Sequence, residues 1–315
     1  MATIASNPDA VELRELSRAR RRYLLRRSLT AWAFLLPEVV VFVIFMLVPV
    51  GWVIRQSFLS GGVLSPARWA GLANWKQAVH DPMVVQAAEN TVLFTAIIVP
   101  IIFTLSIAAA SALRAVKRGG APLRAAIYFP QLIPSVAAAQ IWLFMIHPDF
   151  GVLNVVNRAL HHPPIDFVGQ PHPAFSLVVM FEVWRGIGYW SLFILAAMLA
   201  VPTNQYEAAT LDGAGPLRRF WHVTLPGIQS PLTVAVLLSA ISALQIFDSI
   251  YILTNGGPNG ATQSIVTYMF QTVFQTGEVG YGAVLGLTFL ILIIVLTAGL
   301  VLFVRRRNRL QAETL

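Results

Sequence analysis

Two charged side chains in one apolar stretch are the first candidates for chemistry in this sequence. Glu182 and Arg185 lie within residues 175–201 and are three positions apart, so in a helix they share one face. Charges within hydrocarbon are costly, and they either compensate each other or mark a route for a polar solute. We favour a structural ion pair. The alternative is a solute route lined by both side chains and by the aromatic residues Trp184, Tyr189 and Trp190.

A second polar group lies near the end of another apolar stretch. Asp248 and Gln245 fall within residues 230–253, and their oxygen and amide groups suit the hydroxyls of a carbohydrate. We favour the interpretation that Asp248 is solvated at the membrane interface. The alternative is that it binds a solute. Weaker candidates of the same chemical type are Gln131, Gln140 and Asn90.

No constellation for catalysis or nucleotide binding is visible in the sequence. A phosphate-binding loop needs a lysine after a glycine, and neither Lys76 nor Lys117 follows one. Acids and histidines do not cluster as an acid–base site requires, so we expect no catalytic residue, metal or cofactor in this chain. Four histidines lie in a proline-rich connection, which favours a rigid loop over a metal site. They are His147, His161, His162 and His172.

Composition excludes a soluble protein. Hydrophobic residues make up 57% of the 315 residues and charged residues only 11%, whereas soluble domains carry about 25% charged residues. The net charge of +8 could indicate nucleic-acid binding, but the cations flank apolar stretches instead of forming a patch. We therefore expect a membrane protein that does not bind nucleic acid. The absence of cysteine excludes a disulfide framework.

Six stretches are long and apolar enough to cross a bilayer as helices, since a core of about 30 Å needs about 20 residues. They are residues 31–54, 91–113, 125–146, 175–201, 230–253 and 281–304. Prolines within or near them are tolerated, because neighbouring helices satisfy the freed backbone groups. The pattern predicts an all-α polytopic membrane protein with six transmembrane helices.

The distribution of basic residues predicts the orientation. Seventeen lysines and arginines lie in the two tails and the even-numbered loops, against four in the odd-numbered loops. Cytoplasmic segments carry the excess of basic residues, so both termini are expected in the cytoplasm. The predicted organisation is a basic tail of residues 1–30, a transmembrane domain of residues 31–304 and a second tail of residues 305–315.

The predicted cytoplasmic loop of residues 202–229 has the pattern of a helix, a break and a second helix. Gly213 suits the left-handed backbone at the end of the first helix, and Pro216 suits the first position of the second. One apolar face follows at helical spacing, made of Leu217, Phe220 and Trp221. This face either docks on another protein or rests on the chain's own bundle, and both interpretations stay open on these residues alone.

The same loop resembles the EAA signature of permease subunits in ATP-binding-cassette (ABC) importers. The matching residues are Glu207, Ala208, Ala209, Gly213, Val223, Leu225 and Pro226, with valine where isoleucine is usual. The resemblance implies the type I ABC importer permease fold, with its core at about residues 87–304. It also implies that the loop docks on a separate ATPase and transmits its closure. The coupling residues would be Glu207, Ala208, Ala209, Asp212, Gly213, Leu225 and Pro226.

Other segments resemble the carbohydrate branch of that family, of the maltose and glycerol-phosphate type. They are residues 71–75, 89–91, 248–251 and 254–258. The resemblance implies a sugar importer in the bacterial cell membrane that contains a second, different permease chain. It further implies two ATPase copies that bind ATP and magnesium, and an extracytoplasmic solute-binding protein.

Three alternatives remain open on the sequence. The first is an ion-driven secondary transporter, for which only Glu182 and Asp248 could bind the ion. The second is an importer of the same class for a phosphorylated glycerol, because Arg185 supplies a cation within a span. The third, a membrane enzyme, lacks an acid–base or metal cluster. The exact solute is not determined by these residues.

Overall fold

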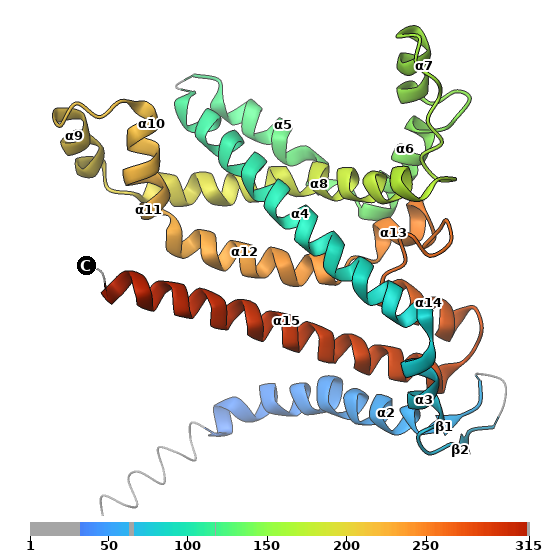
Figure 1. Cartoon of the computed structure of the whole chain (residues 1–315). Helices are drawn as coiled ribbons and strands as arrows, with labels where there is room; N and C mark the ends of the chain where they lie inside the picture. Colours follow the sequence, from blue (N-terminus) through green and yellow to red (C-terminus); the bar gives the residue numbers. More distant parts are fainter. Residues whose placement is uncertain (1–31, 63–65, 117, 314–315) are drawn as a thin grey trace, which may run out of the picture. The chain divides into compact units, whose positions relative to one another are not determined.

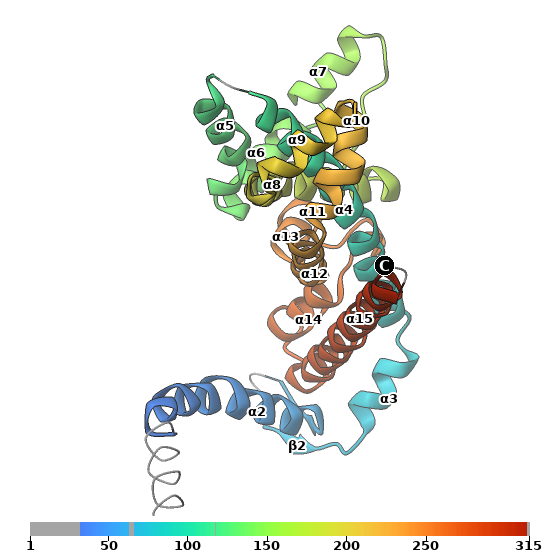
Figure 2. The same ribbon diagram turned by 90° about the vertical axis from the view of Figure 1, so that its left-hand side faces the viewer.

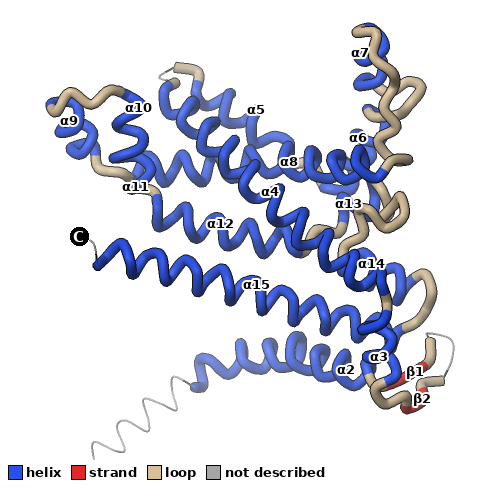
Figure 3. The backbone as a smooth tube through the Cα atoms, in the orientation of Figure 1, coloured by secondary structure: helices blue, strands red, loops and turns tan. Residues whose placement is uncertain are grey.

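The part of the chain that the structure describes is mostly helical. The computed structural model describes residues 32–62, 66–116 and 118–313, so the predicted basic tail of residues 1–30 lies outside the described residues. Among the described residues, strands are limited to β1 (Leu59–Ser60) and β2 (Arg68–Trp69), which pair antiparallel with Leu59 opposite Trp69 (Figure 3). The chain forms two compact units, Met1–Gln56 and Ser57–Leu315, and each is described by itself.

The described part of the first unit, residues 32–56, is one apolar helix. The helix spans Trp32–Ser57 and includes the π-helical turn η1 (Val43–Leu47) and α2 (Val48–Ser57). The π turn ends two residues before Pro49, whose missing amide already interrupts the α-helical hydrogen-bond ladder there. Its large apolar side chains are exposed, as expected for a helix that is covered by lipid or by another chain.

The second unit contains the remaining helices (Figure 1). They are α3 (Ala73–His80), α4 (Pro82–Ala115), α5 (Gly120–Leu132), α6 (Ser135–Met145), α7 (Val152–Ala159), α8 (Pro171–Ala200), α9 (Thr203–Leu211), α10 (Pro216–Arg219), η2 (Phe220–Thr224), α11 (Leu225–Gly227), α12 (Gln229–Leu244), α13 (Asp248–Leu253), α14 (Ile265–Phe274) and α15 (Val279–Glu313).

The apolar helices match five of the six predicted spans, and the remaining span is bent. In the described residues five helices are long and apolar enough to cross a membrane, and α5 with α6 form a pair bent by 94°. The stretch 125–146 is therefore two helices and not the straight span that we predicted. Ile133, which precedes Pro134, is extended, because a proline disfavours helical backbone at the residue before it.

Two helices extend beyond the predicted spans. Helix α4 begins at Pro82, well before the predicted start at residue 91, because Asp81 caps it: its carboxylate accepts from the Met83 amide at 2.9 Å. Proline is favoured in the first turn, where its missing donor costs nothing. At the other end of the chain α15 continues to Glu313, while its apolar, membrane-length part ends at Leu302, close to the predicted end of the span at residue 304.

Helix α4 packs along α8, and this contact forms the main core of the second unit. Phe94 stacks on Phe175 with ring centroids 4.2 Å apart, and Phe103 contacts Trp190 at 5.2 Å. Helix α5 approaches the other side of α8 at Gly188, where a Cβ would lie 2.1 Å from the carbonyl oxygen of Ile127. Small residues at such crossings let membrane helices pack closely.

Polar contacts join helix ends at the side of the bundle away from α9 and α10. The Asp81 carboxylate accepts hydrogen bonds from Tyr268 at 2.6 Å and from Tyr281 at 2.5 Å. The Asn90 amide donates to the carbonyl oxygens of Gly260 and Gln263 at 2.9 and 3.0 Å. Asn90, a weak candidate for solute binding, therefore holds the loop after α13 against α4.

Candidate functional site

The loop of residues 202–229 has the predicted helix, break and helix. Helix α9 ends at Leu211, and Gly213 follows its C-cap residue with a φ of +73°. The Gly213 amide donates to the Thr210 carbonyl at 3.0 Å, and the Ala214 amide donates to the Ala209 carbonyl at 2.9 Å. These two bonds form a Schellman C-cap, in which glycine supplies the left-handed residue. Pro216 opens α10 as predicted.

Most of the predicted coupling residues are exposed at this break. Glu207, Ala208, Asp212, Gly213 and Pro226 are exposed, Ala209 is half-buried, and Leu225 packs against the main core. Figure 2 looks toward the end of the helices where α9 and α10 lie. The expected docking residues are thus accessible in this chain, whereas Leu225 anchors the loop.

The apolar face of the second helix is divided between the surface and the core. Leu217 is 72% exposed and Trp221 is 57% exposed. Phe220, the third residue of the face, packs against the main core. Leu211, at the end of α9, is 90% exposed. Both interpretations of this face hold in part, because one residue rests on the bundle while large apolar side chains remain uncovered.

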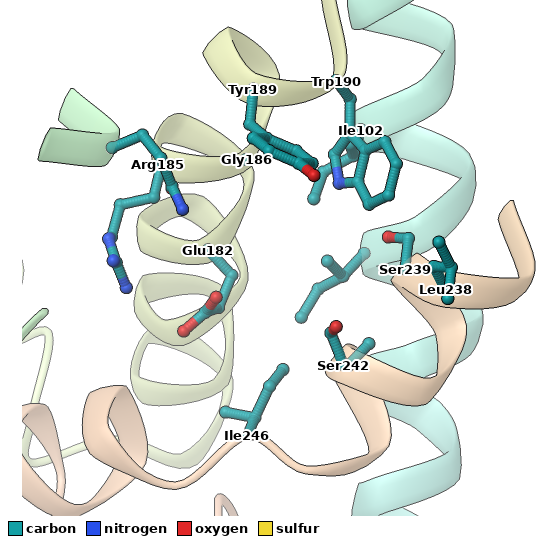
Figure 4. Close-up of a pocket in the computed structure, with 13 residues that line it drawn as sticks. Ile102, Glu182, Arg185, Gly186, Tyr189, Trp190, Leu238, Ser239, Ser242 and Ile246 are labelled. Carbon is teal, nitrogen blue, oxygen red and sulfur yellow. The ribbon is translucent and has the colours of Figure 1, made fainter. Parts of the chain in front are cut away.

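A polar cavity of about 350 Å³ lies between α4, α5, α8 and α12 (Figure 4). Helix α8 contributes a stripe of residues at i, i+3, i+4 and i+7, which share one helix face. They are Glu182, Arg185, Gly186 and Tyr189. Across the cavity, α12 contributes Ser239 and Ser242, the connection after α12 contributes Ile246, and α5 contributes Gln131. The cavity thus combines hydroxyl, amide, carboxylate and guanidinium groups with an aromatic ring.

The ion pair that we favoured is not formed. Within the described residues Glu182 and Arg185 make no salt bridge with each other. The buried Nε of Arg185 has no hydrogen-bond partner, and its guanidinium lies 5.8 Å from the centroid of the Phe181 ring. A cation in a membrane-spanning helix is costly without a partner. The guanidinium therefore keeps donors available for a group that enters the cavity.

Five of the predicted solute residues do not line this cavity: Trp184, Gln245, Asp248, Gln140 and Asn90. Trp184 instead packs with Trp142, at a centroid distance of 5.5 Å, in a separate core cluster. Asp248 accepts a hydrogen bond from the Ser135 hydroxyl. Gln245 is exposed at the end of α12.

Sequence reasoning missed Ser239 and Ser242. Their spacing of three within an apolar stretch was the available signal, since two hydroxyls on one helix face indicate a polar neighbour.

The outer histidines do not assemble a metal site. No group of three or more histidine, cysteine, aspartate or glutamate side chains in the described part of the chain could hold a metal ion. His147 stacks on Phe150 with centroids 3.7 Å apart.

Membrane-length helices with a polar cavity between them and an exposed helix pair at one end are the features expected of a solute permease. Residues 102–309 match the family described as the inner membrane component of binding-protein-dependent transport systems, and the chain belongs to that family. It is a multi-pass membrane protein and a permease subunit of an ABC importer, a family whose members are not enzymes.

Curated relatives align over nearly the whole chain. The sulfoquinovosyl glycerol transport system permease protein of Agrobacterium fabrum is 30% identical and covers 95% of this chain and 97% of its own. The trehalose/maltose transport system permease protein of Thermococcus litoralis is 30% identical over 86% of this chain and 92% of its own. The sn-glycerol-3-phosphate transport system permease protein of Agrobacterium fabrum is 28% identical over 86% and 93%.

Solved structures share the fold. A chain of a bacterial ABC transporter involved in the import of the acidic polysaccharide alginate superposes with a TM-score of 0.80. It is 22% identical, over 91% of this chain and 99% of that one. This agreement confirms the importer permease fold that the loop signature implied.

Proposed function

We propose that this chain forms half of the translocation pathway of an ATP-driven importer for a sugar or a sugar-like solute. A second, different permease chain completes the pathway. Two copies of a separate ATPase, which bind ATP and magnesium, power it, and an extracytoplasmic solute-binding protein delivers the solute. Both termini lie in the cytoplasm, and the complex resides in the bacterial cytoplasmic membrane.

The observation that carries the coupling proposal is the exposed signature helix. Glu207 and Asp212 stand exposed on either side of Ala209, and Leu211 projects a bare apolar side chain beside them. A large apolar side chain that its own bundle leaves uncovered suits a protein interface. We infer that α9 docks in the ATPase, and that Leu217 and Trp221 extend the same surface.

The chemistry of the cavity supports a polyhydroxylated solute. Ser239, Ser242 and Gln131 offer hydrogen bonds of both kinds, and Tyr189 offers a ring face. The names of the relatives add maltose, trehalose and a sulfoquinovosyl glycerol as solutes of similar permeases.

An importer for a phosphorylated glycerol is the second candidate. The specific observation in its favour is Arg185, a cation in the cavity whose Nε has no partner. A guanidinium binds a phosphate through paired, charge-assisted hydrogen bonds. A relative is named for sn-glycerol-3-phosphate.

The first test is to purify the tagged chain with the proteins encoded beside it and to measure ATP hydrolysis in proteoliposomes. Candidate solute-binding proteins are added empty or loaded, and the loaded form is expected to stimulate hydrolysis. Glu207→Lys reverses the charge of an exposed docking residue, so retention of the ATPase and the stimulation should both be lost. Gln205→Lys, on the same helix and also exposed, is the control and should behave like the parent.

The opposite result would be decisive. If the chain purifies without a second permease or an ATPase, and Glu207→Lys matches the parent, the loop does not couple to an ATPase. The chain would then have to be powered by another route, such as an ion gradient. If the complex forms, the ligand whose binding protein stimulates hydrolysis identifies the solute class.

A further inference from the structure

Helix α9 is held to the membrane bundle mainly through one side chain. Of its nine residues only Tyr206 and Ala209 are not exposed. Tyr206 packs against the main core. The Nη1 of Arg219, in α10, also donates to the Thr210 hydroxyl of α9 at 3.0 Å, which ties α9 to the next helix of the same loop. A force applied to α9 therefore reaches the bundle through Tyr206, along the backbone, or through α10.

The Tyr206 hydroxyl has hydrogen-bond partners on two other elements. The Nη1 of Arg114, in the last turn of α4, donates to it at 2.7 Å, and the Arg114 guanidinium lies 4.3 Å from the ring centroid. The hydroxyl also lies 3.1 Å from the Oγ1 of Thr224, which is buried in η2. Since arginine only donates, the Tyr206 proton is free to be donated to Thr224.

These contacts link the loop of residues 202–229 to α4, a helix that does not adjoin this loop in the sequence. Through the backbone, residues 202–229 continue only into α8 and α12. Arg114 instead belongs to α4, which packs along α8 and lines the polar cavity with Ile98 and Ile102. A cation over an aromatic ring, combined with a charge-assisted hydrogen bond, resists separation better than either contact alone.

We propose that Arg114 and Tyr206 are positioning residues that transmit movement of α9 to α4, and so to the wall of the cavity. This inference rests on the proposed coupling of α9 to an ATPase. Closure of the ATPase would pull α9, and the Arg114–Tyr206 contact would move α4 with it. Without that contact, α9 could follow the ATPase while α4 stays behind, and hydrolysis would proceed without transport.

The central variant is Tyr206→Phe in the assembled importer in proteoliposomes. Phenylalanine keeps the ring beneath Arg114 and removes only the hydroxyl with its two hydrogen bonds. Loss of a hydrogen bond to a charged group is expected to lower the number of solute molecules transported per ATP by about tenfold. Retention of the ATPase and the melting temperature should match the parent. Ser111→Ala, whose hydroxyl bonds within α4 at 2.7 Å to Ile107, is the control and should keep the parent ratio.

Two further measurements separate transmission from plain stability. Arg114→Gln should lower transport per ATP similarly, and the double variant should be no worse than either single one, since both remove the same link. Additive losses would contradict the link. If the importer that carries Tyr206→Phe does not assemble, Arg114→Gln becomes the central variant.

Movement can be followed directly, because the chain has no cysteine to compete with introduced labels. Spin labels at Asn204→Cys and Ala112→Cys, both exposed, report the distance between α9 and α4. In the parent this distance should stay constant when ATP binds, and in Tyr206→Phe it should change or broaden. If Tyr206→Phe keeps the parent's transport per ATP and the parent's label distance, while Glu207→Lys still loses ATPase stimulation, this inference alone is overturned. A Glu207→Lys that behaves like the parent overturns the proposed function and this inference with it.

Discussion

At the scale of single residues, the two charges within one span are available to a solute instead of to each other. Glu182 and Arg185 are three positions apart on one helix face, which is close enough to pair. In the structure, however, they line a cavity as separate groups. A carboxylate and a guanidinium that remain separate can accept and donate hydrogen bonds to different parts of one polar solute. The cost of a charge in the membrane is then offset only when solute, water or a partner chain fills the cavity.

Replacement of Arg185 should therefore affect uptake without affecting assembly. We expect Arg185→Gln to lower solute uptake by about tenfold or more, as loss of a charged hydrogen-bond donor does. ATP hydrolysis without solute should be unchanged. Uptake of radiolabelled solute into proteoliposomes measures this, with Arg118→Gln, an exposed arginine outside the cavity, as the control.

The same residue distinguishes the two solute classes. A phosphorylated solute should be transported better by Arg185→Lys than by Arg185→Gln, because lysine keeps the positive charge. Uptake of a neutral sugar should fall by a similar factor with both variants. Full uptake by Arg185→Gln would show that this side chain is outside the pathway.

At the scale of elements, close helix crossings determine the shape of the second unit. Helices α5 and α8 approach at Gly188 so closely that the backbone of α5 occupies the space of a side chain. Both helices line the polar cavity, so their separation sets its width. The bend between α5 and α6 follows from Pro134 and brings Ser135, the first residue of α6, to Asp248.

We expect Gly188→Ala to destabilise this unit. The added methyl group would lie 2.1 Å from a backbone oxygen that cannot rotate away, so the two helices must separate. Overpacking of this kind costs about 1–3 kcal/mol, and the melting temperature in detergent should fall by several degrees. Gly299→Ala in α15, with nothing within 4 Å of the added atom, is the matched control. Equal melting temperatures for the two variants would contradict the close contact.

At the scale of the whole molecule, a carboxylate outside the spans ties helix ends together. Burial raises the pKa of Asp81, but hydrogen bonds from Tyr268, Tyr281 and the Met83 amide outweigh it, so the pKa lies below its ordinary value of 3.8. The stabilisation from this carboxylate is therefore present above about pH 4 and is lost as the pH falls below that value. On the alkaline side, burial and then the hydrogen bond to Asp81 raise the pKa of Tyr268 to about 12.

The alkaline shift predicts a defined loss of stability. A raised pKa means that the fold favours neutral Tyr268, so its contribution is complete below pH 10 and disappears as the pH rises from 10 toward 12. We expect the melting temperature of the parent to fall more steeply between pH 10 and 12 than that of Tyr268→Phe. Thermal unfolding in detergent across this range measures it, with Tyr251→Phe, which has no contact with Asp81, as the control. Parallel curves for the parent and Tyr268→Phe would refute the role of this contact.

What the sequence determined by itself is the local structure. Five of the six apolar runs of about 20 residues form membrane-length helices, because the backbone must satisfy its own hydrogen bonds in hydrocarbon. Gly213 and Pro216 likewise specified the end of α9 and the start of α10, because left-handed backbone and a missing amide are properties of those residues alone. The importer signature lies within that one local segment, so its recognition needed no tertiary information.

Only the tertiary structure decided which polar side chains meet. Spacing along α8 placed Glu182 and Arg185 on one face, but the neighbours of that face come from α4, α5 and α12, far away in the chain. The same applies to Trp184, which turns to another core cluster, and to Arg114, whose partner Tyr206 is 92 residues away. Periodicity reports the direction of a side chain on its own helix, whereas contacts depend on how separate helices pack, and the pattern of one helix does not contain that packing.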